Sequence, residues 1–163
     1  MSKLELNQEQ PCMAGLGRQR ASFTVACLAY GGLIPFVGLA AAGLLDPQRS
    51  AIWQRLALNY GAVILSFVGA LHWGCAMIAP AMSARKRRVC FAWSVIPALL
   101  GWVALSLDYG VGSVLLALGF AAQYLQDWRL LRRASVPGWY LPLRRELTAV
   151  AVLSLLIGNL ASR

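Results

Sequence analysis

The chain has 163 residues, of which 59% are hydrophobic and only 13% are charged, and its mean hydropathy is +0.61. A single soluble core cannot bury that share of apolar surface, so the composition excludes an ordinary water-soluble domain and indicates a membrane protein. The formal net charge of +9 first suggests nucleic acid, but the basic residues lie between apolar runs instead of sharing one water-exposed face. We therefore expect membrane lipids as partners, and no nucleic acid.

Charge-free runs divide the rest of the chain into an all-α bundle of about five transmembrane helices. An N-terminal tail, residues 1–20, is expected to be flexible, and residues 21–163 are expected to form one domain. At 1.5 Å per residue, most of the runs are long enough to cross a hydrocarbon core of about 30 Å. The fifth is the weakest, because its 16 uncharged residues reach only about 24 Å. The predicted spans are 21–45, 56–80, 89–107, 111–126 and 147–162.

The distribution of Lys and Arg predicts the orientation of these spans. Counting cations on alternate sides gives twelve against three, and the richer side is expected to face the cytoplasm, or the matrix in a mitochondrion. The N-terminus is then inside and the C-terminus outside. The richer side holds Lys3, Arg18, Arg20, Arg85, Lys86, Arg87, Arg88, Arg129, Arg132, Arg133, Arg144 and Arg145, and the other side holds Arg49, Arg55 and Arg163.

A cleaved signal peptide is the rival account of the first apolar run. The polar stretch before that run is long and contains Glu5 and Glu9, and the run itself exceeds the usual apolar region of a signal peptide. Gly31, Gly32 and Pro35 also interrupt it midway. These features favour a retained span. Pro35, and Pro97 in the third span, are expected to kink their helices.

Small residues recur every four positions in the second span, at Ala62, Ser66, Ala70 and Gly74. This spacing places them on one stripe, which we interpret as a helix packing contact, with Asn59 on much the same face. A second such face in the fourth span is expected to meet the face of the second span. This second face comprises Gly112, Gly119, Gln123 and Asp127.

The polar residues inside the spans are the candidate site. His72, the only histidine, is predicted about 12 Å deep, where an ionisable group is by default a functional candidate. The alternative is a neutral imidazole that donates to a backbone carbonyl freed by a proline. Gln123, Tyr124 and Asp127 lie within one helical turn, and Trp73 follows His72, so these five residues form a candidate polar layer.

Each charged member of this region also has a simpler interpretation. Asp127 is expected to pair with a nearby arginine as an interfacial anchor, unless it belongs to a site. Arg144 and Arg145 begin the fifth span and are expected to contact lipid headgroups. The four cysteines, Cys12, Cys27, Cys75 and Cys90, show no metal-ligand spacing, so we expect reduced thiols and no metal.

Several of these segments together resemble the transmembrane protein 69 family, a family of unknown function found in bacterial inner membranes and mitochondria. The resemblance covers roughly residues 28–155 and implies a multi-pass protein of the bacterial inner membrane, or of the mitochondrial inner membrane in a eukaryote. It implies no catalytic or binding residues. The segments are Gly31-Gly32-Leu33-Ile34-Pro35-Phe36, Tyr60-Gly61-Ala62-Val63-Ile64-Leu65-Ser66-Phe67, His72-Trp73-Gly74, Gln123-Tyr124 with Asp127, and Trp139-Tyr140 with Leu143-Arg144.

Three functions remain open. The first is a non-catalytic accessory or assembly subunit of a larger membrane complex, a respiratory complex included, suggested by the small size and small-residue faces. The second is a binder of a quinone or lipid headgroup at the inner leaflet, with polar contacts from His72, Gln123 and Tyr124 in a pocket that includes Trp73 and Trp93. The third is a small transporter or proton path. The sequence has no catalytic constellation, so we expect no enzyme.

Overall fold

The computed structural model describes residues 23–78, 82–131 and 138–160, so the N-terminal tail lies outside the described residues. Within these ranges the chain is helical, which confirms the all-α prediction. The helices, in chain order, are α1 (Phe23–Gly31), α2 (Ile34–Leu45), the short 3-10 helix η1 (Pro47–Arg49), α3 (Ser50–Ile78), α4 (Ala84–Leu105), α5 (Tyr109–Leu131) and α6 (Tyr140–Leu160).

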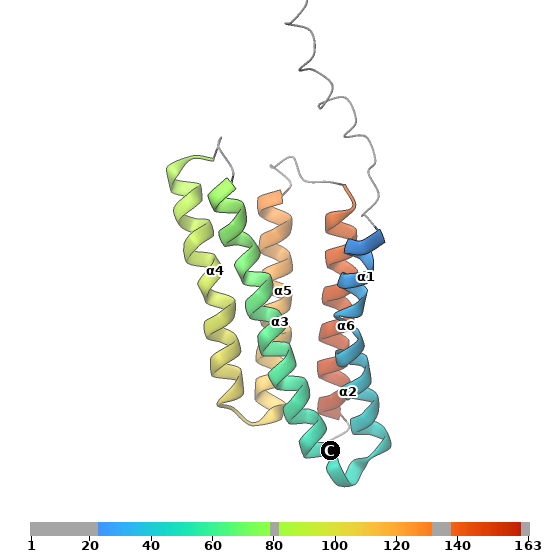
Figure 1. Cartoon of the computed structure of the whole chain (residues 1–163). Helices are drawn as coiled ribbons and strands as arrows, with labels where there is room; N and C mark the ends of the chain where they lie inside the picture. Colours follow the sequence, from blue (N-terminus) through green and yellow to red (C-terminus); the bar gives the residue numbers. More distant parts are fainter. Residues whose placement is uncertain (1–22, 79–81, 132–137, 161–163) are drawn as a thin grey trace, which may run out of the picture.

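These helices form a bundle in which successive rods alternate in direction (Figure 1). α1 and α2 follow one another along a single rod, and α3, α4, α5 and α6 form one rod each. α3 is the central rod, because it packs most extensively on α4 and also contacts α2 and α5. α6 lies between α5 and α2 and closes the bundle. We call the end where α3 and α5 finish and α4 and α6 begin the basic end, after the basic residues Arg85, Lys86, Arg87, Arg88 and Arg129.

The first predicted span is broken near its middle. A turn at Gly32 and Leu33 interrupts the helix, and Pro35 lies in the first turn of α2, where its missing N–H costs no hydrogen bond. The helix is therefore interrupted just before Pro35, whereas the sequence predicted a kink at the proline itself. The Tyr60 hydroxyl on α3 donates to the Gly32 carbonyl at 2.8 Å, so the break leaves this backbone acceptor satisfied.

The last two helices are longer than their predicted spans, 111–126 and 147–162. α5 has 23 residues and α6 has 21, so each can extend for about 30 Å. The prediction ended spans at charged residues, whereas α5 continues through Asp127 and α6 begins before Arg144. The helices can include both charges because the two side chains bind each other inside the bundle. The helix of the fifth span is therefore longer than its charge-free run, while its full crossing of the membrane stays a prediction.

Three helical stretches of the described chain are long and apolar enough to cross a membrane, by length and composition: Phe23–Leu45, Pro47–Met77 and Ala84–Leu105. Polar side chains lower the hydropathy of α5 and α6, which pack beside these three. The structure thus agrees with a helical membrane bundle, while the orientation inferred from the cations stays a prediction.

An apolar core fills the middle of the bundle with residues from five helices. Phe36 of α2 packs edge-on against the rings of Tyr60 and Phe120, with centroids 5.0 and 5.9 Å apart. Such edge-to-face pairs stabilise beyond the area they bury. The rest of the core comes from α3, α4, α5 and α6, and comprises Leu58, Ala62, Leu65, Ala104, Leu116, Ala151 and Leu155.

Small residues let α3 and α4 approach closely, but only part of the predicted stripe takes part. A Cβ on Gly101 of α4 would lie 3.3 Å from the Ala62 Cβ, so Ala62 is a contact as predicted. Ala70 and Gly74, by contrast, lie on the exposed side of α3, and a Cβ on Gly74 would meet no other atom within 4 Å. The close contact nearer the basic end is made instead by Gly69. Periodicity located the stripe but could not show which side of it faces a neighbour.

Gly69 and Gly74 provide a matched test of this packing. A Cβ at Gly69 would lie 2.9 Å from the Ser94 carbonyl oxygen and 2.9 Å from Pro97 Cγ, so Gly69→Ala must push α3 and α4 apart. We expect a loss of about 1–3 kcal/mol in unfolding free energy, measured by denaturation in detergent. Gly74→Ala, on the open side, should change stability by less than about 1 kcal/mol. Equal effects of the two substitutions would contradict the close approach at Gly69.

Candidate functional site

A buried charge lies at the centre of the predicted polar layer. The Asp127 carboxylate on α5 accepts from Arg144 Nε on α6 at 2.9 Å, through Oδ2. Its other oxygen, Oδ1, lies 3.2 Å from His72 Nε2 on α3. Asp127 is 3% exposed and Arg144 is 7% exposed, so neither charge faces solvent or lipid. One carboxylate therefore joins three helices about one to two turns from the basic end.

Gln123 extends this layer toward α4. Its amide nitrogen lies 2.8 Å from His72 Nδ1 and donates to the Val68 carbonyl at 3.5 Å. Its amide oxygen accepts from Trp93 Nε1 at 2.8 Å. With these contacts, a continuous chain of hydrogen bonds runs from Trp93 through Gln123, His72 and Asp127 to Arg144, and it connects four helices.

The donor at the Trp93 end of this chain fixes the direction of the bonds from Trp93 to Asp127. The Trp93 indole can only donate, so it must face the oxygen of the Gln123 amide. The amide nitrogen then faces His72 Nδ1, which must accept and carries no proton. The proton of the neutral imidazole is consequently on Nε2, and it is donated to Asp127. Trp93 thus sets the tautomer of His72 through Gln123.

The layer as a whole is electrically neutral. The carboxylate of Asp127 and the guanidinium of Arg144 cancel each other, and His72 in this hydrogen-bonding pattern is uncharged. A buried ion pair is tolerated in a low-dielectric interior only if good geometry and further hydrogen bonds compensate its lost hydration. The second carboxylate oxygen, bonded to His72, supplies part of that compensation.

The structure separates the residues that the sequence grouped together. His72, Gln123 and Asp127 meet as a cluster, whereas Tyr124 is half-buried and outside the hydrogen-bond chain, and Trp73 is 48% exposed. Trp73 instead packs edge-on against Phe91, with ring centroids 4.7 Å apart.

The two arginines assigned to headgroups also differ from each other. Arg145 is exposed, and its contact with headgroups stays a prediction, whereas Arg144 points into the bundle, where it binds Asp127. Sequence reasoning missed this role because adjacent helical residues point about 100° apart, and only the partner on α5 selects which one turns inward. The pairing of Asp127 with an arginine was foreseen, but as an interfacial contact and not as a buried one.

A second polar contact lies on the outer side of the same level. The Tyr30 hydroxyl of α1 donates to Glu146 Oε2 of α6 at 2.7 Å, and both side chains are exposed. Arg144 and Glu146 therefore use neighbouring positions of α6 to bind helices on opposite sides. Among the described residues, this hydrogen bond is the polar contact between α1 and α6.

The layer has little unused hydrogen-bonding capacity for a ligand. Both ring nitrogens of His72, both ends of the Gln123 amide and both oxygens of Asp127 already have protein partners. Nη2 of Arg144 is the exception, because it is buried and has no hydrogen-bond partner among the described residues. The described residues contain no cluster of three metal-ligating side chains. The hydrogen bonds of this layer therefore hold the helices to one another. We call the hydrogen-bonded chain of Trp93, Gln123, His72, Asp127 and Arg144 the clamp.

The tautomer can be tested directly, because the chain contains a single histidine. In protein labelled with ¹⁵N-histidine, we expect the wild type at neutral pH to show the neutral form protonated on Nε2. Trp93→Phe removes the donor that orients Gln123, so a mixture of tautomers should result. Trp102→Phe, an exposed indole outside the chain, is the control and should leave the spectrum unchanged. A wild-type signal protonated on Nδ1 would refute the assignment.

Arg144 and its neighbour Arg145 test the clamp energetically. Arg144→Gln leaves the Asp127 carboxylate buried without its counter-charge, which should cost about 3–5 kcal/mol in unfolding free energy. Arg145→Gln removes an equal charge from an exposed position and should cost less than about 0.5 kcal/mol. Both are measured by unfolding in detergent. If the two variants were equally stable, Arg144 would be a headgroup contact like its neighbour.

Comparison with known proteins gives a family but no activity. Residues 21–160 match the family model described as "Protein of unknown function (DUF3429)". The chain is 38% identical over 140 residues to "Transmembrane protein 69" of Xenopus tropicalis, covering 82% of this chain and 52% of that protein. It is 27% identical over 131 residues to the mouse protein of the same name, covering 77% and 51%. The chain thus spans about half the length of these relatives. No solved structure matches it.

Proposed function

The chain belongs to the DUF3429 family of membrane proteins, which includes relatives named transmembrane protein 69, and from that premise we propose that it is a non-catalytic accessory or assembly subunit of a larger membrane complex. Its proposed location is an energy-transducing inner membrane, bacterial or mitochondrial. The observation that carries the proposal is an exposed face of α3 whose composition suits a partner helix better than lipid.

This α3 face consists of Asn59, Val63, Phe67, Ala70 and Gly74, all of which are exposed. The spacing of four, four, three and four residues places them along one side of the helix. Small side chains at Ala70 and Gly74 would let another backbone approach closely, which is the usual basis of helix association in a membrane.

Asn59 is the polar member of the α3 face. It lies nine residues after the start of α3, about 13 Å along the helix, and makes no hydrogen bond to the rest of the described chain. An amide with no partner in hydrocarbon is costly, whereas an amide between helices can form a hydrogen bond across the contact. A helix of another subunit on this face would satisfy it.

The geometry of the polar layer also favours a subunit over the two other functions. A quinone or lipid headgroup at the inner leaflet would need free donors or acceptors, but those of His72 and Gln123 are used within the bundle. A proton path would need groups that exchange protons with both sides, whereas the clamp fixes His72 between Gln123 and Asp127. These features support a structural role for the polar layer, which stabilises the bundle on which a partner subunit would dock.

Affinity purification in a mild detergent tests the proposal. The wild type should carry a stoichiometric partner of defined identity. Gly74→Leu should reduce the partner's yield roughly tenfold, which corresponds to about 1.4 kcal/mol of lost contact. Gly38→Leu is the matched control, because Gly38 on α2 is also exposed with nothing within 4 Å, and it should retain the partner. A monodisperse, partner-free wild type would count against a subunit role.

A further inference from the structure

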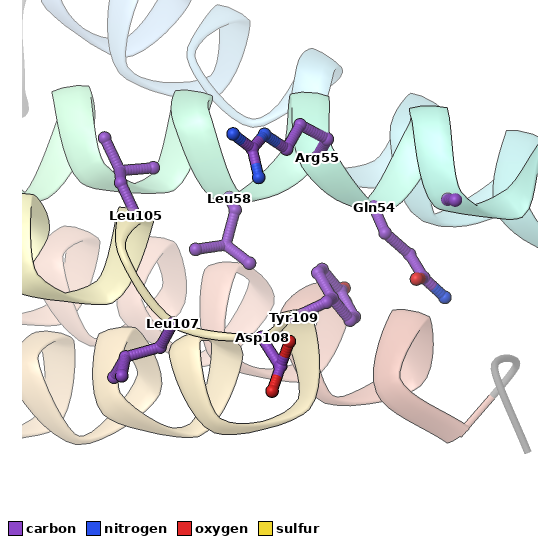
Figure 2. Close-up of a pocket in the computed structure, with 8 residues that line it drawn as sticks. Gln54, Arg55, Leu58, Leu105, Leu107, Asp108 and Tyr109 are labelled. Atoms are coloured by element: carbon purple, nitrogen blue, oxygen red, sulfur yellow. The ribbon is translucent and has the colours of Figure 1, made fainter.

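A small cavity lies at the end of the bundle opposite the basic end, where α3 begins and α4 passes into α5 (Figure 2). Its volume is about 190 Å³. This is below the range of about 300–1,000 Å³ that holds drug-sized ligands, so it fits only a small group. The polar layer is near the basic end, and none of the residues that line the cavity belongs to that layer or to the α3 face.

Two opposite charges line this cavity without neutralising each other. Arg55 of α3 and Asp108, just before α5, are both exposed, and within the described chain neither takes part in an ion pair. Gln54 also lines it, and its amide nitrogen donates to the Gly158 carbonyl of α6 at 3.3 Å. That bond orients the side chain and leaves its amide oxygen as an acceptor. The cavity therefore offers one cationic donor group together with two acceptors.

The remaining wall is apolar. Leu58 is buried beneath the cavity, while Leu105 and Leu107 are 36% and 39% exposed beside it. Trp102, one turn before the end of α4, is 68% exposed, as is typical of an aromatic residue at a membrane boundary. The site thus combines a charged rim at the helix ends with an apolar wall that continues along the helices.

We propose that this cavity binds the headgroup of a zwitterionic phospholipid with a primary ammonium, phosphatidylethanolamine. The guanidinium of Arg55 binds the phosphate, since it presents several N–H donors in a planar fork. The carboxylate of Asp108 and the amide oxygen of Gln54 accept from the ammonium. Leu105 and Leu107 contact the first methylene groups of the acyl chains.

The charge pattern distinguishes this headgroup from those of phosphatidylglycerol and phosphatidylcholine. Phosphatidylglycerol has the phosphate but no ammonium, so it would leave the Asp108 carboxylate without a counter-charge. Phosphatidylcholine has the positive charge, but its methylated nitrogen has no N–H to donate. Only a primary ammonium satisfies the phosphate-binding and the carboxylate-binding parts of the cavity together.

Native mass spectrometry of the full chain, with the three lipids offered in competition, tests the site. We expect the wild type to retain phosphatidylethanolamine over phosphatidylglycerol by roughly three- to tenfold, as one added charged contact predicts. Asp108→Asn should abolish that preference, and Arg55→Gln should weaken both lipids. Arg49→Gln, an exposed arginine of η1 outside the cavity, is the control and should change neither. Equal retention of the three lipids by the wild type would overturn the proposal.

A second arm separates the lipid from its soluble headgroup. Phosphoethanolamine carries the same two charges but no acyl chains. If a lipid occupies the site, millimolar phosphoethanolamine should displace little phosphatidylethanolamine, because it cannot contact the leucine wall. Full displacement by the soluble compound would overturn the assignment to a lipid. Neither result depends on a partner subunit, so the test is independent of the proposed function.

Discussion

The burial of the Asp127 carboxylate is the constraint on which the bundle depends. A charge in a dry interior must have a counter-charge and hydrogen bonds, and here Arg144 and His72 supply them from two other helices. These bonds fix the depth of α3, α5 and α6 relative to one another, since a shift by one residue would separate the partners. Gln123 and Trp93 extend the same register to α4. Apolar packing alone, as around Leu65 and Leu116, tolerates small displacements more readily.

The polar chain and the glycine contacts complement each other along the membrane axis. Near the basic end, donors and acceptors of fixed direction align the helices. Farther along the bundle, Gly101 and Gly112 let backbones approach closely, and a side-chain carbon at Gly112 would lie 2.6 Å from the Ala104 carbonyl oxygen. The hydrogen bonds determine which helices pair and in which register, and the glycine contacts increase the area over which the helices pack. Lipid supplies little force between apolar helices, so a membrane bundle benefits from having both.

The sequence predicted a helical membrane protein. It also predicted three members of the hydrogen-bonded chain, His72, Gln123 and Asp127, because polar residues at helical spacing are conspicuous within apolar runs. The prediction that Arg144 contacts lipid headgroups and the short spans predicted for α5 and α6 have the same cause. Ending a span at each charge assumes that every charge lies outside the membrane, and this fails where two charges on different helices neutralise each other. Likewise, periodicity shows that Ala70 and Gly74 lie on one side of a helix. It does not show whether a neighbouring helix packs on that side, because this depends on the tertiary structure.

The break at Gly32 and Leu33 divides the first rod into two parts, and far more contacts hold α2 in the bundle than hold α1. α2 is anchored by Phe36, which is 2% exposed, whereas no residue of α1 (Phe23–Gly31) is buried. Within the described ranges, the polar contact of α1 with α6 is the surface hydrogen bond between Tyr30 and Glu146. Few contacts therefore oppose separation of α1 from the bundle, and its local opening should require far less free energy than global unfolding. Detachment of α1 would uncover this edge of the bundle without breaking the hydrogen bonds of the polar layer or the contacts of the core, because α1 contributes to neither.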